Sequence, residues 1–88
     1  MEEVIERLRI QLELQSWPDV YLFKFIVPNE SDKVAQVSAL FNDSSDLVFH
    51  PSRNGNYISV SAKELMLDVD SILEKYIQAS KIKGLIAL

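Results

Sequence analysis

The fold of this chain is decided by Ser52-Arg53-Asn54-Gly55-Asn56-Tyr57-Ile58-Ser59-Val60-Ser61. An Asn-Gly pair between stretches of alternating residues is typical of a β-hairpin, because a type I′ turn needs a positive φ at both central positions. Glycine adopts that conformation at little cost, and asparagine adopts it more readily than most residues. With Asn54 and Gly55 as the turn, Phe49 faces Val60 across an antiparallel hairpin.

This register gives the hairpin one apolar face and one mostly polar face. The apolar face holds Leu47, Phe49, Pro51, Ile58, Val60 and Ala62, and the other face holds Val48, His50, Ser52, Tyr57, Ser59 and Ser61. Such alternation is typical of a sheet with a core on one side. Phe49 is therefore expected in the core, where truncation to alanine would cost about 3–5 kcal/mol. Pro51 places the first hairpin strand at a sheet edge, where a missing N–H is tolerated.

The composition is that of one small globular domain, with 88 residues, of which 48% are hydrophobic and 25% charged. A net charge of −4 argues against binding of duplex DNA or of a membrane surface through a basic patch. The absence of cysteine excludes disulfides, thiolate metal ligands and catalytic thiols. No apolar run is long enough to span a bilayer, and the acidic start is unlike a signal peptide. The cytoplasm is the expected location.

The N-terminal segment, residues 2–13, fits two patterns. Val4, Ile5, Leu8 and Leu12 have helical spacing, whereas Leu8, Ile10, Leu12 and Leu14 alternate as in a strand. A helix is favoured because glutamate, arginine, leucine and glutamine are good helix formers. The Trp17-Pro18 pair then ends this segment, since proline disfavours helix at the residue before it.

The other patterns predict two more strands and two more helices. Residues 20–27 are rich in β-branched and aromatic side chains and predict a strand that ends at Pro28. Asn29 is expected to cap the next helix and Asp68 the last one. The apolar stripes of these helices are Val34, Val37, Leu40 and Phe41, and then Val69, Ile72, Leu73, Tyr76 and Ile77. Residues 82–88 are expected to form the final strand.

The predicted fold class is α+β. After an N-terminal helical extension over residues 1–16, residues 17–88 follow the order βαββαβ, which is typical of a ferredoxin-like sandwich. Two helices are expected on one face of a four-stranded antiparallel sheet with the spatial strand order 4-1-3-2. The whole chain, residues 1–88, is expected to form a single domain.

Several stretches resemble a known family. They are Trp17-Pro18, Phe23-Lys24-Phe25-Ile26-Val27-Pro28, the Ser-Arg-Asn-Gly-Asn-Tyr-Ile-Ser-Val run and the closing Ile-Lys-Gly-Leu-Ile-Ala-Leu. They resemble the YbeD-like family of small bacterial proteins of unknown function, from about Trp17 to Leu88. The resemblance implies a fold similar to the ACT domain, a regulatory ligand-binding plait. It implies the fold more than the function, because one plait hosts many unrelated activities.

Four residues are candidates for binding a ligand or a partner. Lys24 interrupts an otherwise apolar strand, and the neighbouring third strand is expected to bring Tyr57 and Ser59 close to it. Together they could hold a small anion or a partner's carboxylate. The alternative is that Lys24 lies on the open face with its stem over apolar neighbours. Arg53, at the hairpin tip, is the fourth candidate. The alternative is that the residues of this tip are there because the turn requires their backbone conformation, and not because they bind a ligand.

The sequence carries no pattern of a catalytic or metal site. His50 is the only histidine and lacks the second histidine or cysteine of a usual transition-metal site. No paired carboxylates, glycine-rich phosphate loop or Ser/His/Asp arrangement is present. We therefore predict neither an enzyme nor a cofactor or metal.

The open face of the predicted sheet carries more apolar surface than a monomer usually leaves in water. It holds Leu22, Ile26, Val48, Tyr57 and, in the last strand, either Leu85 with Ala87 or Ile82 with Ile86. We expect the N-terminal stripe, a second subunit or another protein to cover it. The pattern favours a non-catalytic regulatory or interaction module, homodimeric or bound to a protein partner or small ligand.

A single-stranded RNA-binding plait is the alternative function. RNA-recognition plaits have the same topology and stack bases on aromatic side chains of the first and third strands. Tyr57 is the one aromatic residue expected on the open face, and the acidic net charge further disfavours RNA. Neither DNA nor a membrane is an expected partner.

Overall fold

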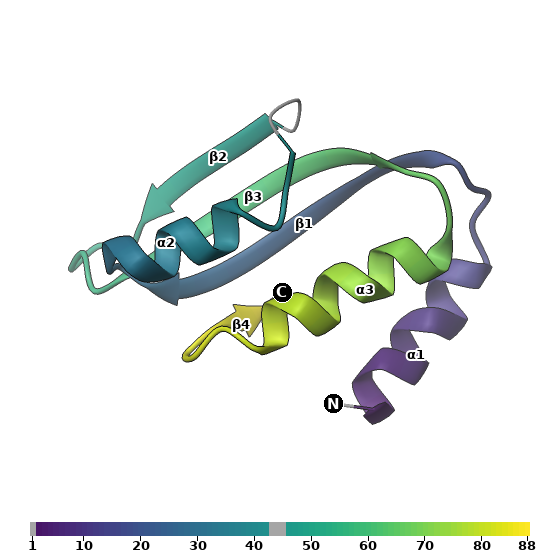
Figure 1. Cartoon of the computed structure of the whole chain (residues 1–88), viewed down its shortest axis with the longest axis horizontal. Coiled ribbons are helices and arrows are strands. Elements are labelled where there is room, and N and C mark those ends of the chain that lie inside the picture. Colours follow the sequence, from purple (N-terminus) through teal and green to yellow (C-terminus); the bar gives the residue numbers. More distant parts are fainter. Residues whose placement is uncertain (1, 43–45) are drawn as a thin grey trace.

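The chain forms a four-stranded antiparallel sheet with helices packed on one face and a further helix at its edge, as the computed structural model shows (Figure 1). The structure describes residues 2–42 and 46–88. In chain order, the elements are α1 (Glu2–Glu13), β1 (Asp19–Pro28), α2 (Ser31–Ser38), β2 (Asp46–Pro51), β3 (Tyr57–Met66), α3 (Val69–Ser80) and β4 (Ile86–Ala87).

The strands lie in the order β2-β3-β1-β4, which is the predicted order 4-1-3-2 counted from the other edge. The two central strands pair over their whole length, from Asp19 opposite Met66 to Pro28 opposite Tyr57. The predicted hairpin register is also confirmed, since Phe49 pairs with Val60 in β2 and β3. The alternation of apolar residues therefore predicted the pairing correctly.

The turn of the hairpin differs from the expected type I′ turn. Gly55 has a φ of +77°, but no other residue of the described ranges, Asn54 included, has a positive φ unless it is a glycine. Ser52 N–H donates to Tyr57 O at 2.8 Å, and Gly55 N–H donates to Ser52 O at 2.9 Å. A four-residue loop, residues 53–56, therefore joins the strands, and Asn54 Oδ1 stabilises it by accepting from Asn56 N–H at 3.1 Å.

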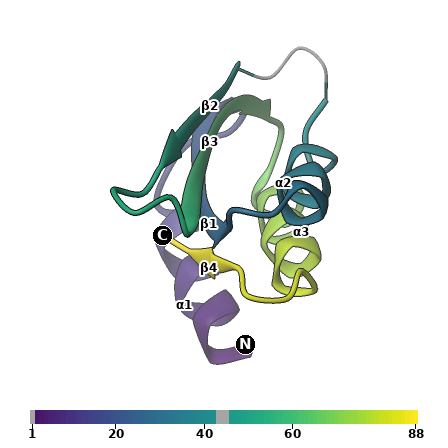
Figure 2. The same ribbon diagram turned by 90° about the vertical axis from the view of Figure 1, so that its left-hand side faces the viewer.

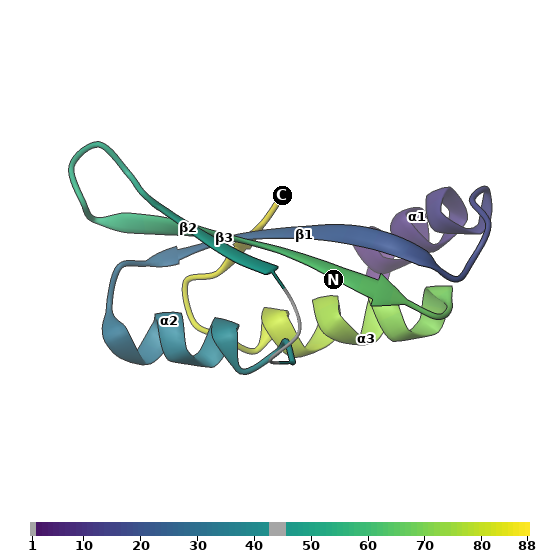
Figure 3. The same cartoon turned by 90° about the horizontal axis from the view of Figure 1, so that it is seen from above.

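The core lies between the sheet and the pair of helices α2 and α3, which share one side of the sheet (Figure 3). Phe23, Phe25 and Val27 of β1 point into it and are fully buried, because every second side chain of a strand lies on the same side of the sheet. The other side chains of the core are Leu12, Val37, Phe41, Ile58, Val60, Ala62, Met66, Ile72, Leu73, Ala79 and Ile82.

Phe49 does not belong to this core, and the expectation of full burial was wrong. Its side chain is 41% exposed although it is on the face that the helices cover. The physical reason is position: β2 is the edge strand, and the helices pack under β1, β3 and β4. Alternation assigns a residue to a face, but only the extent of the helix layer decides its burial.

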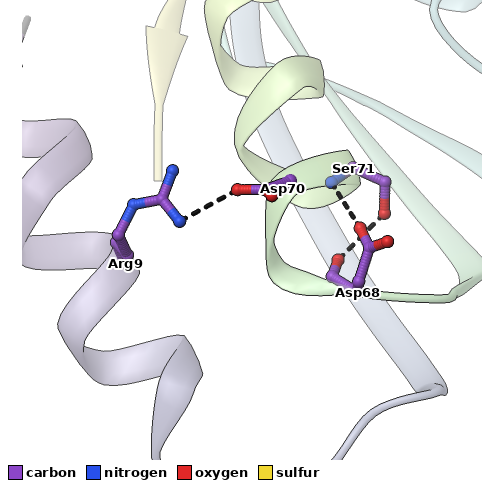
Figure 4. Close-up of polar contacts among 4 residues, drawn as sticks. All are labelled: Arg9, Asp68, Asp70 and Ser71. Carbon is purple, nitrogen blue, oxygen red and sulfur yellow. Dashed lines mark hydrogen bonds and ion pairs between the residues drawn. The ribbon is translucent and has the colours of Figure 1, made fainter.

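Helix α1 packs beside α3 at the β1 edge of the sandwich, not on the open face of the sheet (Figure 2). Its side chain Leu12 is only 2% exposed, and Trp17 Nε1 donates to the Leu12 carbonyl oxygen at 2.9 Å. Arg9 of α1 also pairs with Asp70 of α3 at 2.9 Å (Figure 4). The N-terminal stripe therefore does not cover the open face of its own chain, which was one of the expected arrangements, whereas the helix expected over residues 2–13 is confirmed.

The two predicted helix caps have different outcomes. Asp68 caps α3 as expected, because its carboxylate accepts from Ser71 N–H at 2.8 Å (Figure 4). Asn29 does not cap α2, whose N-cap residue is Glu30. Asn29 instead joins the end of β1 to the hairpin loop, with Nδ2 donating to Gly55 O at 3.0 Å.

The final strand is shorter than the predicted segment of residues 82–88. Only Ile86–Ala87 forms β4, while Ile82 is buried in the core directly after α3. Between them Gly84 turns the chain with a φ of +84°, and a Cβ there would lie 2.9 Å from Pro28 Cγ. Any larger residue at this position would be strained in its backbone and would collide with β1.

The Asp68 cap predicts a pH-dependent contribution to stability. The hydrogen bonds from Ser71 hold the pKa of Asp68 below its ordinary value of 3.8. A lowered folded-state pKa means that the stabilisation is present above the ordinary value and is lost as the pH falls through the folded value. We therefore expect Asp68→Ala to lower the thermal midpoint at neutral pH and to differ less from the wild type as the pH falls below the ordinary value of 3.8.

Circular dichroism melts across this pH range would measure the effect. Asp68→Asn is the matched control, because asparagine also caps helices but has no titrating carboxyl group. The asparagine variant should stay close to the wild type at neutral pH. An equal loss in the alanine variant at every pH would show that the ionised carboxylate is not what stabilises this helix end.

Candidate functional site

The candidate site is the open face of the sheet, which is the side away from α2 and α3 (Figure 3). The pairing of the strands determines which residues are neighbours on this face. Lys24 lies opposite Ser61, and Ile26 lies between Ser59 of β3 and Ile86 of β4. The C-terminal Leu88 is held next to Lys24, since its N–H donates to the Lys24 carbonyl oxygen at 2.9 Å. Four strands therefore contribute to one surface.

Three of the four sequence-predicted site residues come together on this face. Lys24, Tyr57 and Ser59 line a shallow hollow of about 520 Å³. Ile86 and Leu88 form part of its wall on the β4 side. The prediction that the first and third strands bring these side chains near one another agrees with the pairing of β1 and β3.

Arg53 is not part of this hollow. It lies in the exposed loop between β2 and β3, outside the group of residues that line the depression. Lys24 itself is exposed, and no ion pair in the described part of the chain involves it. Its ammonium group is therefore free to meet an anionic group of a ligand or a partner.

A second hollow of about 700 Å³ continues along the same face, and it is lined by charged residues that were not among the residues predicted for the site. Lys24 and His50 line both hollows, and Lys63 and Asp46 line the second one. The face thus holds two lysines and one acid in a chain whose net charge is −4. Lys63 could have been found by continuing the alternation of Tyr57, Ser59 and Ser61 by one more step.

Large apolar side chains surround these polar groups and remain in contact with solvent. Leu22, Val48 and Ile86 are 54%, 48% and 53% exposed. Tyr57 is 48% exposed and presents its ring on the same side. Of the two alternatives for the last strand, the pair Ile82 and Ile86 is half right: Ile86 lies on this face, but Ile82 is buried in the core. Leu85 and Ala87 line a hollow on the helix side.

Ser59 and His50 lie opposite each other on this face, but their side chains are not bonded to each other. The Ser59 hydroxyl donates to the main-chain oxygen of His50 at 3.4 Å, so the imidazole is not its partner. Within residues 2–42 and 46–88, no group of three or more His, Cys, Asp or Glu side chains could hold a metal ion. In the same ranges, no helix is long and apolar enough to cross a membrane.

Comparison with known proteins adds no relative: no family model, no curated protein and no solved structure matches this chain. The resemblance to the YbeD-like family therefore stays a prediction based on the sequence motifs quoted above. Any function has to be argued from the residues of the open face themselves.

Proposed function

We propose that this protein is a non-catalytic interaction module that binds another protein through the open face of its sheet. The observation that carries the proposal is the cluster of exposed apolar side chains, Leu22, Val48, Tyr57 and Ile86, around Lys24, which forms no ion pair with any residue that the structure describes. Contiguous apolar surface with a polar rim is typical of protein interaction sites. Helix α1, one of the candidates expected to cover this surface, packs against α3 instead.

The charges of the face indicate the chemistry of the partner. Lys24 and Lys63 outnumber Asp46, so an incoming surface with carboxylates and apolar side chains would match it. Complementary charges mainly increase the rate of association and select the partner, while the buried apolar area supplies most of the affinity. A homodimer would have to pair this face with an acidic surface elsewhere on the second copy, because the same face on both copies would bring lysines together.

The fold itself supports a regulatory or interaction role. We propose that residues 17–88 are a ferredoxin-like, ACT-like plait of the YbeD-like family. The order βαββαβ and the strand order β2-β3-β1-β4 support this assignment. Such a plait leaves one sheet face free for binding, although the fold alone does not specify a partner.

The proposal is tested by charge-introducing variants of the open face. We expect Val48→Asp to weaken partner binding by at least about tenfold, because a carboxylate buried against apolar groups is costly. Lys24→Glu should weaken it as well by reversing the charge that meets the partner. Ile10→Asp is the matched control, since Ile10 is 58% exposed on α1, away from the sheet face.

Two measurements give the readout. Light scattering of the purified protein would show a dimer that Val48→Asp dissociates and Ile10→Asp does not, if the partner is a second copy. For any other partner, the immobilised wild type and variants would be compared for capture of the same protein, confirmed with purified components. Equal capture and equal oligomeric state in all variants would refute the proposal.

Titration with mixed-sequence RNA oligonucleotides tests the alternative in the same samples. We expect no binding at physiological salt, because the described part of the open face presents one aromatic ring, Tyr57. Micromolar binding that Tyr57→Ala abolishes would favour a single-stranded RNA-binding plait instead.

A further inference from the structure

A separate hollow of about 370 Å³ lies where four elements meet at the β1 edge of the sandwich. Helix α1, strand β1, helix α3 and the segment around β4 each form one wall. The lining residues are Val4, Ile5, Leu8, Tyr21, Tyr76, Ser80, Leu85, Ala87 and Leu88. Apart from Leu88, none of them lines the hollow around Lys24 on the open face.

The hollow exists because α1 packs tightly at one end only. Leu12, near the end of the helix, is 2% exposed, and Arg9 pairs with Asp70 of α3. Ile5 and Leu8 are half-buried, and Val4, one turn further toward the N-terminus, is 60% exposed. The N-terminal half of α1 therefore does not pack closely against the other elements, and its apolar side chains line the hollow.

The walls of the hollow define what could occupy it. None of the nine lining side chains is an acid, a base or a histidine, so these side chains offer a charged ligand no counter-charge in return for its lost hydration. The polar side chains that line the hollow are those of Ser80, Tyr21 and Tyr76. Ser80 already donates its hydrogen to the Ile77 carbonyl oxygen at 2.6 Å.

The two tyrosines leave one hydrogen-bond donor available. Their hydroxyl oxygens are 2.8 Å apart, and either can be the donor of the bond between them. Two O–H groups share this one hydrogen bond, so the second hydrogen has no partner among the described residues. Burial raises the pKa of Tyr76 far above its ordinary value, which keeps the phenol protonated and able to donate.

We propose that this hollow is a binding site for a neutral, mainly hydrocarbon small molecule that carries one hydrogen-bond acceptor such as a carbonyl oxygen. The hydrocarbon part would pack between α1 and the β4 segment, and the oxygen would accept from the tyrosine pair. A hollow of this size, with apolar walls and a few converging polar groups, is typical of small-molecule sites. The site shares only Leu88 with the hollow around Lys24 on the proposed protein-binding face.

The test uses the full chain and 2-octanone as the probe, followed by amide chemical shifts in NMR. We expect saturable binding, with shifts concentrated at Ile5, Leu8, Tyr76 and Leu85. Octanoate and octylammonium, which have a similar chain length but carry a charge, should bind at least about tenfold more weakly. Equal binding of a charged analogue would overturn the proposal.

Two variants fill the hollow from opposite walls, so that the failure of one to fold leaves the other informative. Val4→Trp from α1 and Ser80→Trp from α3 start at exposed positions and should each abolish saturable binding. Val48→Trp on the open face is the matched control and should bind 2-octanone as the wild type does. Binding that survives both fillings, or shifts that map to the open face, would refute the site.

The tyrosine pair needs a double variant, because either hydroxyl alone could still donate to the ligand. Tyr21→Phe combined with Tyr76→Phe should weaken 2-octanone binding by about threefold to tenfold, the usual contribution of a neutral hydrogen bond. An unchanged affinity in the double variant would show that the tyrosines do not recognise an acceptor.

Discussion

Phe25→Ala is expected to destabilise the protein by about 3–5 kcal/mol. Phe25 is fully buried. The centroid of its ring lies 5.6 Å from the ring centroid of Tyr76 and 6.2 Å from that of Phe41. Neighbouring rings from α3 and from the segment after α2 cannot all move into the space that its removal leaves, so a cavity adds to the lost burial. Urea unfolding followed by circular dichroism measures the loss.

Phe49→Ala is the matched control, because it removes the same side chain from the same face of the sheet. At 41% exposure Phe49 has less apolar area to lose, and we expect a cost of about 1–2 kcal/mol. Small domains are stable by only about 5–15 kcal/mol, so Phe25→Leu serves where the alanine variant does not fold. Equal costs at the two positions would contradict the edge position of β2 beyond the helix layer.

The sequence predicted those parts of the fold that depend on local pattern. The β-branched and aromatic side chains of residues 20–27 identified a strand, because such residues are enriched in strands. Asp68 was recognised as a helix cap for an equally local reason, since its carboxylate reaches an N–H only three residues away. Interactions within one strand or one helical turn can be predicted without knowing how the rest of the chain folds.

The errors concern relations between elements that are distant in the sequence. The spacing of Val4, Ile5, Leu8 and Leu12 shows that α1 has an apolar stripe, but it does not show which neighbour the stripe contacts. Asn54 and Gly55 allowed a two-residue turn, yet the hydrogen bonds of Ser52 favour a four-residue loop with the same strand register. Both alternatives satisfied the local pattern.

The candidate site was predicted in part for the same reason. Lys24 and Ser59 could be placed together because the predicted strand order made β1 and β3 neighbours. The contribution of Ile86 could not be resolved from the sequence, since it depends on where the chain turns at Gly84. The hollow beside Tyr76 had no sequence signal, because residues from four separate elements form it.

Leu12→Ala is expected to lower the stability by about 2–5 kcal/mol, which would make α1 an integral part of the fold. Leu12 is 2% exposed and belongs to the same buried cluster as Phe23 and Ile72, although it lies outside the predicted plait. Leu14→Ala is the matched control: its side chain is 85% exposed, so its truncation should change the stability by no more than about 0.5 kcal/mol. Urea unfolding distinguishes the two.

The same variant separates the stability of the fold from the function of the open face. Since α1 packs against α3 and away from Leu22, Val48 and Tyr57, Leu12→Ala should leave partner binding or self-association of the folded molecules unchanged. Removal of residues 1–15 should likewise destabilise the chain without uncovering the open face, which is already exposed. If Leu12→Ala instead changed the oligomeric state at full folding while its stability stayed that of the wild type, α1 would have to contact the open face or a second copy, and its packing against α3 would be wrong.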